Sequence, residues 1–268
     1  MHYKISKFCY LLLFITTGLL YSQDSNYRTL PNNAFSYGER LSYEIGYSFL
    51  TAAEAFINIS PSPVIINGRD TYEVNFDVNS RSSFEIIYKV RDNYKTYIDS
   101  KGLFPLKFEQ HIREQNFKKD FEAVFMPDKQ KVKTTVNYND VREFDAPAYV
   151  QDIFSSMYYI RTLDLKSKKD GDIITVETFN DDKHFPLSVK IIGREEVDVP
   201  AGEFKTIVVK PELQEGFTSK TSDIFVYLSD DDRKIPVKVK MKIIIGALTG
   251  ELTEYSGLYG PLDSKIGD

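Results

Sequence analysis

The chain has one cysteine, Cys9, among its 268 residues. Cys9 lies in an apolar run near the amino terminus, residues 8–20, so the rest of the chain has no thiol with which to form a disulfide. A protein without disulfides relies on the burial of apolar side chains, and a chain of this length buries roughly 70 % of its unfolded surface. The scarcity of cysteine therefore predicts a sizeable hydrophobic core.

Histidine is also scarce, which limits the chemistry that the chain offers. Only His111 and His184 lie beyond the apolar run, and no HExxH-like spacing is present, so we expect no metal site and no cofactor. Ser155 and Ser156 lie near Asp152, but neither serine belongs to a GxSxG or SxxK pattern. A hydrolase would need a distant histidine beside one of these serines, and we expect no catalytic residues.

A concentrated basic segment is missing as well. The chain has 34 Lys and Arg against 39 Asp and Glu, whereas a protein that neutralises phosphates needs a basic face. We therefore expect no nucleic-acid partner. Low-complexity tracts and internal repeats are also missing. Because no boundary signal divides the chain, residues 23–268 are predicted to form one domain, with two lobes as the alternative.

The amino-terminal residues have the features of a secretory signal peptide. Lys4 and Lys7 precede the apolar run, and Ser22 offers a small residue for cleavage. We predict that residues 1–22 are removed and that the protein is exported to the periplasm or cell envelope, with no transmembrane segment after cleavage. An anchoring helix is the alternative, although the run is shorter than the roughly 20 residues that a bilayer span needs.

Residues 150–161 form the segment whose apolar residues recur most clearly at helical spacing. This spacing predicts an amphipathic helix with one apolar and one polar stripe. The apolar stripe contains Val150, Ile153, Phe154, Met157 and Ile160, and the polar stripe contains Asp152, Ser155, Ser156 and Tyr159.

On both sides of this segment, apolar and polar residues alternate with a period of two, which is typical of strands. Asn67-Gly68 favours a type I′ hairpin turn, and Val199-Pro200-Ala201-Gly202 favours a type I turn with a glycine bulge. Residues 237–248 are predicted to form one strand. The expected fold is mainly β: an antiparallel meander forming a curved sheet or open barrel, with the one amphipathic helix packed on its concave side.

Four charged residues follow patterns that have structural explanations. Asp152 and Arg161 lie at opposite ends of the predicted helix, where they complement the helix dipole. The alternative is that they are buried and pair with the sheet. Asp231 and Arg233 belong to the charged run 230–234, which is typical of a hairpin turn. Calcium binding by the carboxylates of this run is the alternative.

Lys238, Lys240 and Lys242 alternate with apolar residues and therefore share one strand face. A solvated face explains them, because lysines discourage edge-to-edge pairing of sheets. The alternative is that they bind anionic lipid head groups or acidic polysaccharide. Lys119 likewise interrupts an aromatic strand face, which argues against an outer-membrane barrel.

Aromatic residues are abundant, with 19 Phe and 18 Tyr. They fill a core in most proteins, but they also line cavities for apolar ligands. The residues we expect to line such a cavity are Tyr43, Tyr47, Phe154, Met157 and Tyr158.

Four motifs follow one another along the chain. They are GERLSYEIGY at 38–47, QDIFSSMYYIR at 151–161, GREEVDVPAGEFKTIVVKP at 193–211 and LSDDDRKIPVKV at 228–239. Together they resemble the motifs of the domain of unknown function 3108 family, exported proteins of Gram-negative bacteria, and the leader ending LLYSQ resembles signal peptides of the Bacteroidetes. The resemblance implies export and a β-rich domain, and it implies no catalytic residues.

These expectations lead to a hypothesis on function. The protein is expected to be a non-enzymatic factor of the periplasm or cell envelope that binds an apolar or amphiphilic envelope component, such as a lipid, in the concavity of its sheet. A structural or assembly partner of another envelope protein is the first alternative. A hydrolase with an unrecognised arrangement of residues is the second.

Overall fold

The structure is a computed structural model that describes residues 27–47, 50–212, 223–242 and 246–267. The first strands are β1 (Arg40–Tyr47), β2 (Leu50–Ile59), β3 (Val64–Ile66), β4 (Arg69–Ser80), β5 (Arg91–Asp99), β6 (Pro105–Glu114), β7 (Phe117–Met126), β8 (Lys131–Val136) and β9 (Asp140–Asp145). The helix α1 (Ile153–Arg161) follows, and then β10 (Ile173–Asn180), β11 (Lys183–Val199), β12 (Gly202–Glu212), β13 (Ile224–Ser229), β14 (Pro236–Lys242), β15 (Ala247–Ser256) and β16 (Lys265–Ile266).

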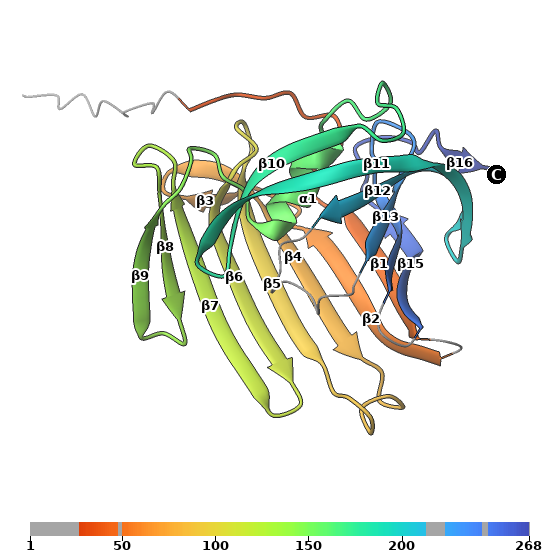
Figure 1. The fold of residues 1–268 in the computed structure, drawn as a ribbon, viewed down its shortest axis with the longest axis horizontal. Coiled ribbons are helices and arrows are strands. Elements are labelled where there is room, and N and C mark those ends of the chain that lie inside the picture. Colours follow the sequence, from red (N-terminus) through yellow and green to blue (C-terminus); the bar gives the residue numbers. More distant parts are fainter. Residues whose placement is uncertain (1–26, 48–49, 213–222, 243–245, 268) are drawn as a thin grey trace, which may run out of the picture.

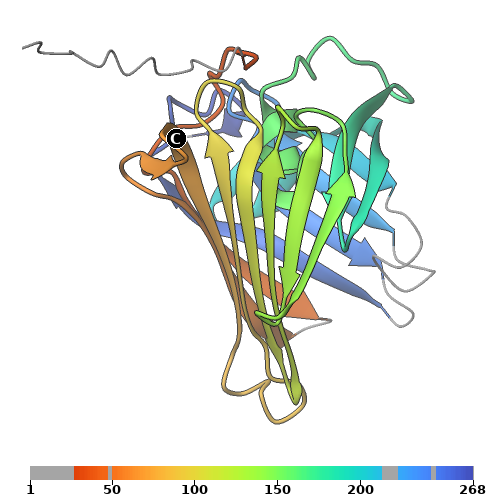
Figure 2. The same cartoon turned by 90° about the vertical axis from the view of Figure 1, so that its left-hand side faces the viewer.

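The described strands form one antiparallel sheet that curves around α1 (Figures 1 and 2). Hydrogen-bonded neighbours follow the order β10-β11-β12-β13-β14-β15-β1-β2-β4-β5-β6-β7-β8-β9, with β3 beside β4 and β16 beside β12. The strands β9 and β10 are therefore the two edges of the sheet, and the chain that joins them carries α1. Because this connection crosses between the edges, the helix lies on the concave side.

The inner face of the sheet is apolar and the outer face is polar, as the period-two pattern predicts. On β1, Leu41 and Tyr43 are buried on the inner face, whereas Ser42 and Glu44 are only half-buried. The inner positions of β2 include the small residue Ala55, which pairs with Tyr43 in the register of the sheet. The predicted fold class, an open curved antiparallel sheet with one helix, is confirmed.

The two edges approach each other through the turn between β10 and β11. Asp181 and Asp182 occupy this turn with positive φ angles of 44° and 61°. Lys119 Nζ on β7 lies 2.8 Å from Asp181 Oδ1, and Thr134 Oγ1 on β8 donates to Asp182 Oδ1 over 2.8 Å. Arg142 Nη1 on β9 lies 3.0 Å from Asp182 Oδ2. The turn thus docks on the last three strands of the other edge.

The free edge of β10 is covered by the residue that leads into the helix. Gln151 N donates to Glu177 O, and Phe179 N donates to Gln151 O, both over 2.8 Å. These bonds pair Gln151 with the edge strand, and an exposed strand edge is prone to unwanted pairing. The start of the helix is therefore fixed relative to the sheet.

Two predicted boundaries are wrong. The helix was expected over residues 150–161, but it begins at Ile153, because the side chain of Asp152 accepts hydrogen bonds from the backbone N–H groups of Phe154 and Ser155 and caps the helix. The strand expected over residues 237–248 is a hairpin, in which Lys242 pairs with Ala247. The predicted signal peptide, residues 1–22, lies outside the described residues. None of the helices in the described ranges is long and apolar enough to cross a membrane.

Candidate functional site

The helix α1 buries side chains of both its polar and its apolar stripe, which the sequence pattern did not predict. Ser155 and Ser156 are buried, together with Arg161 at the end of the helix. Ile153 and Met157, from the apolar stripe, are only half-buried. Both side chains nevertheless face the sheet, since Met157 packs against the hydrophobic core and Ile153 lies opposite β11 to β13. The apolar stripe therefore lies on the concave side, and polar contacts fix the ends of the helix.

The first polar contact fixes the start of the helix to β5. Asp152 accepts from Phe154 N over 2.8 Å and from Ser155 N over 2.9 Å, while Asp152 N donates to Ser155 Oγ. Thr96 Oγ1, on the inner face of β5, donates to the second carboxylate oxygen of Asp152 over 2.6 Å. Burial raises the pKa of Asp152, although these hydrogen bonds oppose the shift. Asp152 thus caps the helix and joins it to the sheet.

The second polar contact fixes the end of the helix to the amino-terminal segment. Arg161 and Glu39 are both fully buried, and two parallel bonds of 2.7 Å join the guanidinium to the carboxylate. Arg161 Nε donates to Arg233 O over 3.0 Å, and Tyr158 OH donates to Glu39 Oε1 over 3.2 Å. Burial acts to lower the pKa of Arg161, but the Glu39 carboxylate outweighs it and raises that pKa. Asp152 and Arg161 are therefore both buried, as the alternative expects. Asp152 pairs with the sheet through Thr96, whereas Arg161 pairs with Glu39, which precedes β1.

Two adjoining apolar hollows lie between the helix and the sheet, and because they share three lining residues we treat them as two lobes of one cavity. The first lobe has a volume of about 340 Å³ and lies between α1 and the strands β1, β2, β4, β13, β14 and β15. The second lobe has a volume of about 290 Å³ and lies between α1 and β11 to β14. Met157, Ile224 and Val239 line both lobes. These volumes are in the range of small-molecule sites, which are roughly 300–1,000 Å³.

Aromatic rings close the first lobe on the side of β5. The centroid of Phe154 lies 5.0 Å from those of both Phe76 and Tyr94. Burial, with the neighbouring charge of Asp92, raises the pKa of Tyr94 to about 12. Burial also raises the pKa of Asp92 to about 6, helped by the charge of Glu114 and opposed by the hydrogen bond from Arg113 N. Asp92 and Glu114 thus lie close to Tyr94 in the aromatic wall.

Three of the five residues expected to line a cavity meet in the first lobe, namely Tyr43, Phe154 and Met157. Tyr47 instead borders a different hollow beside Gly46. Tyr158 is fully buried against Glu39. The sequence reasoning missed several lining residues, although their inward positions follow from strand alternation: Ile45, Ile57, Ile224, Val239 and Met241.

Asp231 organises a turn, as its sequence pattern favours. The carboxylate is buried and accepts from Ser229 Oγ over 2.9 Å and from Ser264 Oγ over 2.5 Å. It also accepts from Arg233 N over 2.8 Å, and the Arg233 guanidinium lies 5.3 Å from the ring centre of Tyr259. These protein hydrogen bonds occupy the carboxylate. No group of three potential metal ligands occurs among the residues whose structure is described.

The three alternating lysines lie on the outer face of β14, away from the cavity. Lys238 Nζ lies 2.6 Å from Glu251 Oε1, and Lys242 Nζ lies 5.4 Å from the ring centre of Phe225. Lys240 pairs in register with Thr249. The lysines therefore form an outward face, and Lys238 is already paired there.

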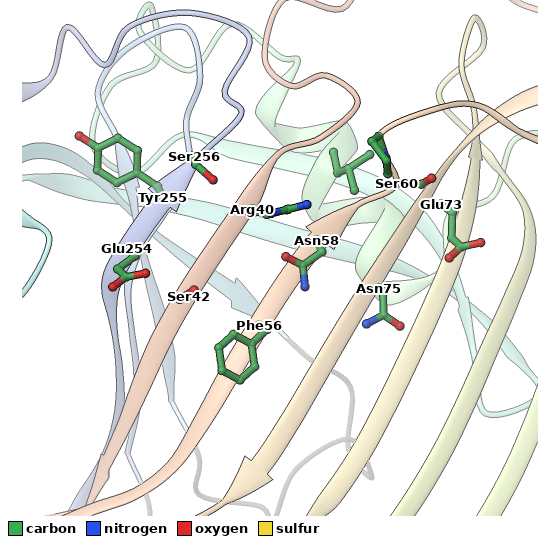
Figure 3. A pocket seen from close by; sticks show the side chains of 12 residues that line it. Arg40, Ser42, Phe56, Asn58, Ser60, Glu73, Asn75, Glu254, Tyr255 and Ser256 are labelled. Carbon is green, nitrogen blue, oxygen red and sulfur yellow. The ribbon is translucent and has the colours of Figure 1, made fainter.

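A larger and more polar hollow lies on the outer face of the same sheet (Figure 3). It has a volume of about 700 Å³ and spans β15, β1, β2 and β4. Asn58 and Asn75 line it, together with the charged residues Arg40, Glu73 and Glu254. The two faces of these strands thus carry hollows of opposite chemical character.

The histidines and serines do not form a hydrolytic arrangement. His111 Nδ1 lies 2.7 Å from Asp120 Oδ1, and His184 pairs with Glu177. Ser155 Oγ serves the helix cap, and Ser156 Oγ donates to Ile153 O within the helix. These hydrogen bonds are structural.

Comparison with known proteins gives a family and a fold. A family described as protein of unknown function (DUF3108) matches residues 42–253. The structure is similar to a β-barrel-like protein of the DUF1849 family from Brucella abortus, with a TM-score of 0.57, 11% identity, and coverage of 83% of this chain and 99% of that chain. This likeness shows a shared fold. No curated protein matches the sequence.

Two further solved structures are more distant. A hypothetical protein from Chlamydia trachomatis has a TM-score of 0.37 and 7% identity, with coverage of 88% of this chain and 94% of that chain. A Bacteroides fragilis protein, provisionally described as exported and YmcC-like in fold, has a TM-score of 0.31 and 13% identity, with coverage of 86% and 99%. These TM-scores are too low to support a shared fold.

Proposed function

This chain belongs to the DUF3108 family of proteins of unknown function, and we propose that it is an exported, non-enzymatic protein that binds an apolar or amphiphilic component of the cell envelope. The binding site is the two-lobed cavity between α1 and the concave side of the sheet. Export is supported by the features of the leader, residues 1–22, and by the resemblance of the four motifs in the rest of the chain to those of exported proteins.

The apolar stripe of α1 is the observation that carries this proposal. Amphipathic helices normally bury their apolar face against the protein, because each buried methylene contributes about 0.8 kcal/mol. Here Ile153 and Met157 are only half-buried and border cavity space, although Met157 also packs against the core. Asp152 and Arg161 fix the two ends of the helix through polar contacts. The helix therefore presents apolar surface to an empty volume, which an apolar ligand would cover.

The lining of the cavity supports the non-enzymatic character of the proposed function. Neither lobe is lined by a charged side chain or a histidine, the commonest general bases. The hydroxyls of Tyr43 and Ser156 border the lobes without such a base beside them and donate to backbone carbonyl groups. The apolar side chains of the cavity can contact an apolar ligand and shield it from water, which favours binding.

Uptake of an apolar probe tests this proposal. Protein refolded from denaturant, and so freed of bound lipid, is titrated with a fluorescent fatty acid. We expect Val239→Gln, which places an amide between the two lobes, to weaken binding by about tenfold or more. The matched control is Lys240→Gln, whose side chain lies on the outer face, and it should bind like the unaltered protein. Absence of uptake by folded, unaltered protein would contradict the proposal.

A second candidate, an assembly partner for another envelope protein, is favoured by an exposed apolar loop. Ile86 is 92% exposed and Ile87 is 65% exposed, in the connection between β4 and β5. Exposed apolar groups of this kind mark contact surfaces. The double substitution Ile86→Ser with Ile87→Ser should release a protein partner that copurifies with the unaltered chain, while leaving fatty-acid uptake unchanged.

A further inference from the structure

We infer that the ligand of the cavity is a two-chain lipid, with one acyl chain in each lobe and the head group outside. This inference rests on the proposed function and adds the chemical class of the ligand. Three features of the cavity lead to it: a ridge that divides the lobes, a lining without charge, and two nearly equal volumes.

The ridge is formed by side chains from three different elements. Met157 of α1, Ile224 of β13 and Val239 of β14 line both lobes and therefore stand between them. The first lobe extends from this ridge towards β1, β2 and β4, and the second extends towards β11 and β12. A ligand that fills both lobes has to divide at the ridge or bend over it.

The lining accepts hydrocarbon and excludes a head group. The polar side chains that border the lobes already have partners, since Tyr43 OH donates to Pro236 O over 2.7 Å and Ser156 Oγ donates to Ile153 O over 2.7 Å. An unpaired charge transferred into such surroundings loses its hydration without compensation. The charged part of an amphiphile must therefore remain at the opening.

The volumes match two chains of similar length. A cavity of about 150 Å³ holds benzene, or about 25 Å³ for each carbon. On that scale the first lobe of about 340 Å³ holds about fourteen carbons and the second of about 290 Å³ holds about twelve. Two acyl chains joined at one head group fill both lobes without bending, whereas one long chain would have to cross the ridge.

Two substitutions fill the lobes separately. Gly250 lines the first lobe alone, and a Cβ placed on it meets no heavy atom within 4 Å, so Gly250→Leu adds a side chain to open space. Val226 lines the second lobe alone, and Val226→Phe fills that lobe. Thermal unfolding of each variant checks that it is folded. If a variant does not fold, the smaller substitution Gly250→Val or Val226→Leu takes its place.

The experiment compares dilauroyl and monolauroyl phosphatidylcholine by native mass spectrometry of refolded protein. We expect the unaltered protein to bind one two-chain lipid or up to two single-chain lipids. Each filled variant should bind one single-chain lipid. It should bind the two-chain lipid at least about tenfold more weakly than the unaltered protein does, because at least two methylene groups of the lipid are no longer buried.

The outcomes separate this inference from the proposed function. Binding of at most one single-chain lipid, with no preference for the two-chain lipid, would overturn the inference and leave the proposed function in place. Equal binding by the filled variants and the unaltered protein would overturn it as well, since the lipid would then lie elsewhere. Failure of the folded, unaltered protein to bind either lipid would overturn both.

Discussion

The pair of Glu39 and Arg161 shows how a single buried contact can fix the position of a helix. Both side chains are fully buried, and the guanidinium also donates to the carbonyl oxygens of Ala34 and Arg233. Desolvation of two charges is compensated only when the pairing geometry is good and the remaining donors are satisfied. Here three nitrogens of Arg161 have partners, so the pair links the amino-terminal segment, the helix and the β13–β14 turn.

We predict that Arg161→Met destabilises the protein by about 3–5 kcal/mol, because it leaves the Glu39 carboxylate buried and unpaired. Adding Glu39→Gln to Arg161→Met should restore part of this loss, since the buried charge is then removed. Urea unfolding of the two single variants and the double variant measures the coupling. Additive losses would show that the two side chains act independently.

Asp92 makes the stability of the protein depend on pH. Its pKa in the folded state is about 6, above the unfolded value of about 3.9. The folded state therefore binds this proton more tightly, so the contribution of Asp92 is favourable below about pH 4 and is lost as the pH rises through about 6. Compared with Asp92→Asn, the unaltered protein should gain a few degrees in Tm when the pH falls from 7.5 to 5. An unchanged difference between the two Tm values would contradict the shift.

At the scale of the element, α1 is held by its ends and its polar side, so its apolar side is free to border the cavity. The capping box at Asp152 and the bond from Thr96 tie the helix to β5. The helix has nine residues, which is too short to be stable alone in water. Its position therefore depends on these tertiary contacts.

We predict that Asp152→Ala costs about 2–4 kcal/mol, the sum of a lost cap and a buried Thr96 hydroxyl without its partner. Asp152→Asn keeps the oxygen that caps the helix and should cost about 1 kcal/mol. Chemical denaturation gives both values. Fatty-acid uptake should fall with Asp152→Ala more than with Asp152→Asn, because the helix forms one wall of the cavity.

At the scale of the whole molecule, the sheet is open, and the β10–β11 turn bridges its edges. Asp182 bonds to Thr134 and Arg142, and its side chain is 18% exposed, whereas Asp181 bonds to Lys119 and is 58% exposed. Exposed ion pairs contribute little, about 0–1 kcal/mol. The better-buried Asp182 is therefore the main contact between the edges.

We predict that Asp182→Asn costs about 1 kcal/mol and raises hydrogen exchange of the β9 backbone amides by about fivefold, because the edges separate more often. Asparagine keeps the positive φ angle of this position without strain. Asp181→Asn is the matched control, and it should change exchange by less than about twofold. Equal effects from both substitutions would argue against a special role for Asp182.

Much of the fold could be predicted from local patterns. The alternation of β1 and β2 separates inner from outer residues correctly, and Asn67 and Gly68 adopt the positive φ angles of 50° and 77° that their hairpin turn requires. The strand predicted over residues 237–248 failed because a single glycine, Gly246 with a φ of 85°, marks the reversal. The sequence analysis expected a cavity for an apolar ligand, and three of the five residues expected to line it do so.

The sequence by itself determined the β class, the presence of one helix and the outward lysines, because these depend on residues close together in the chain. Only the tertiary structure decided that Arg161 meets Glu39, 122 residues away, and that β15 lies beside β1. It also decided that the helix buries Ser155 and Ser156 as well as part of its apolar stripe. The reason is that burying a polar or charged group is favourable only if a partner is buried beside it. That partner often comes from a distant segment, so the pattern within one segment cannot predict it.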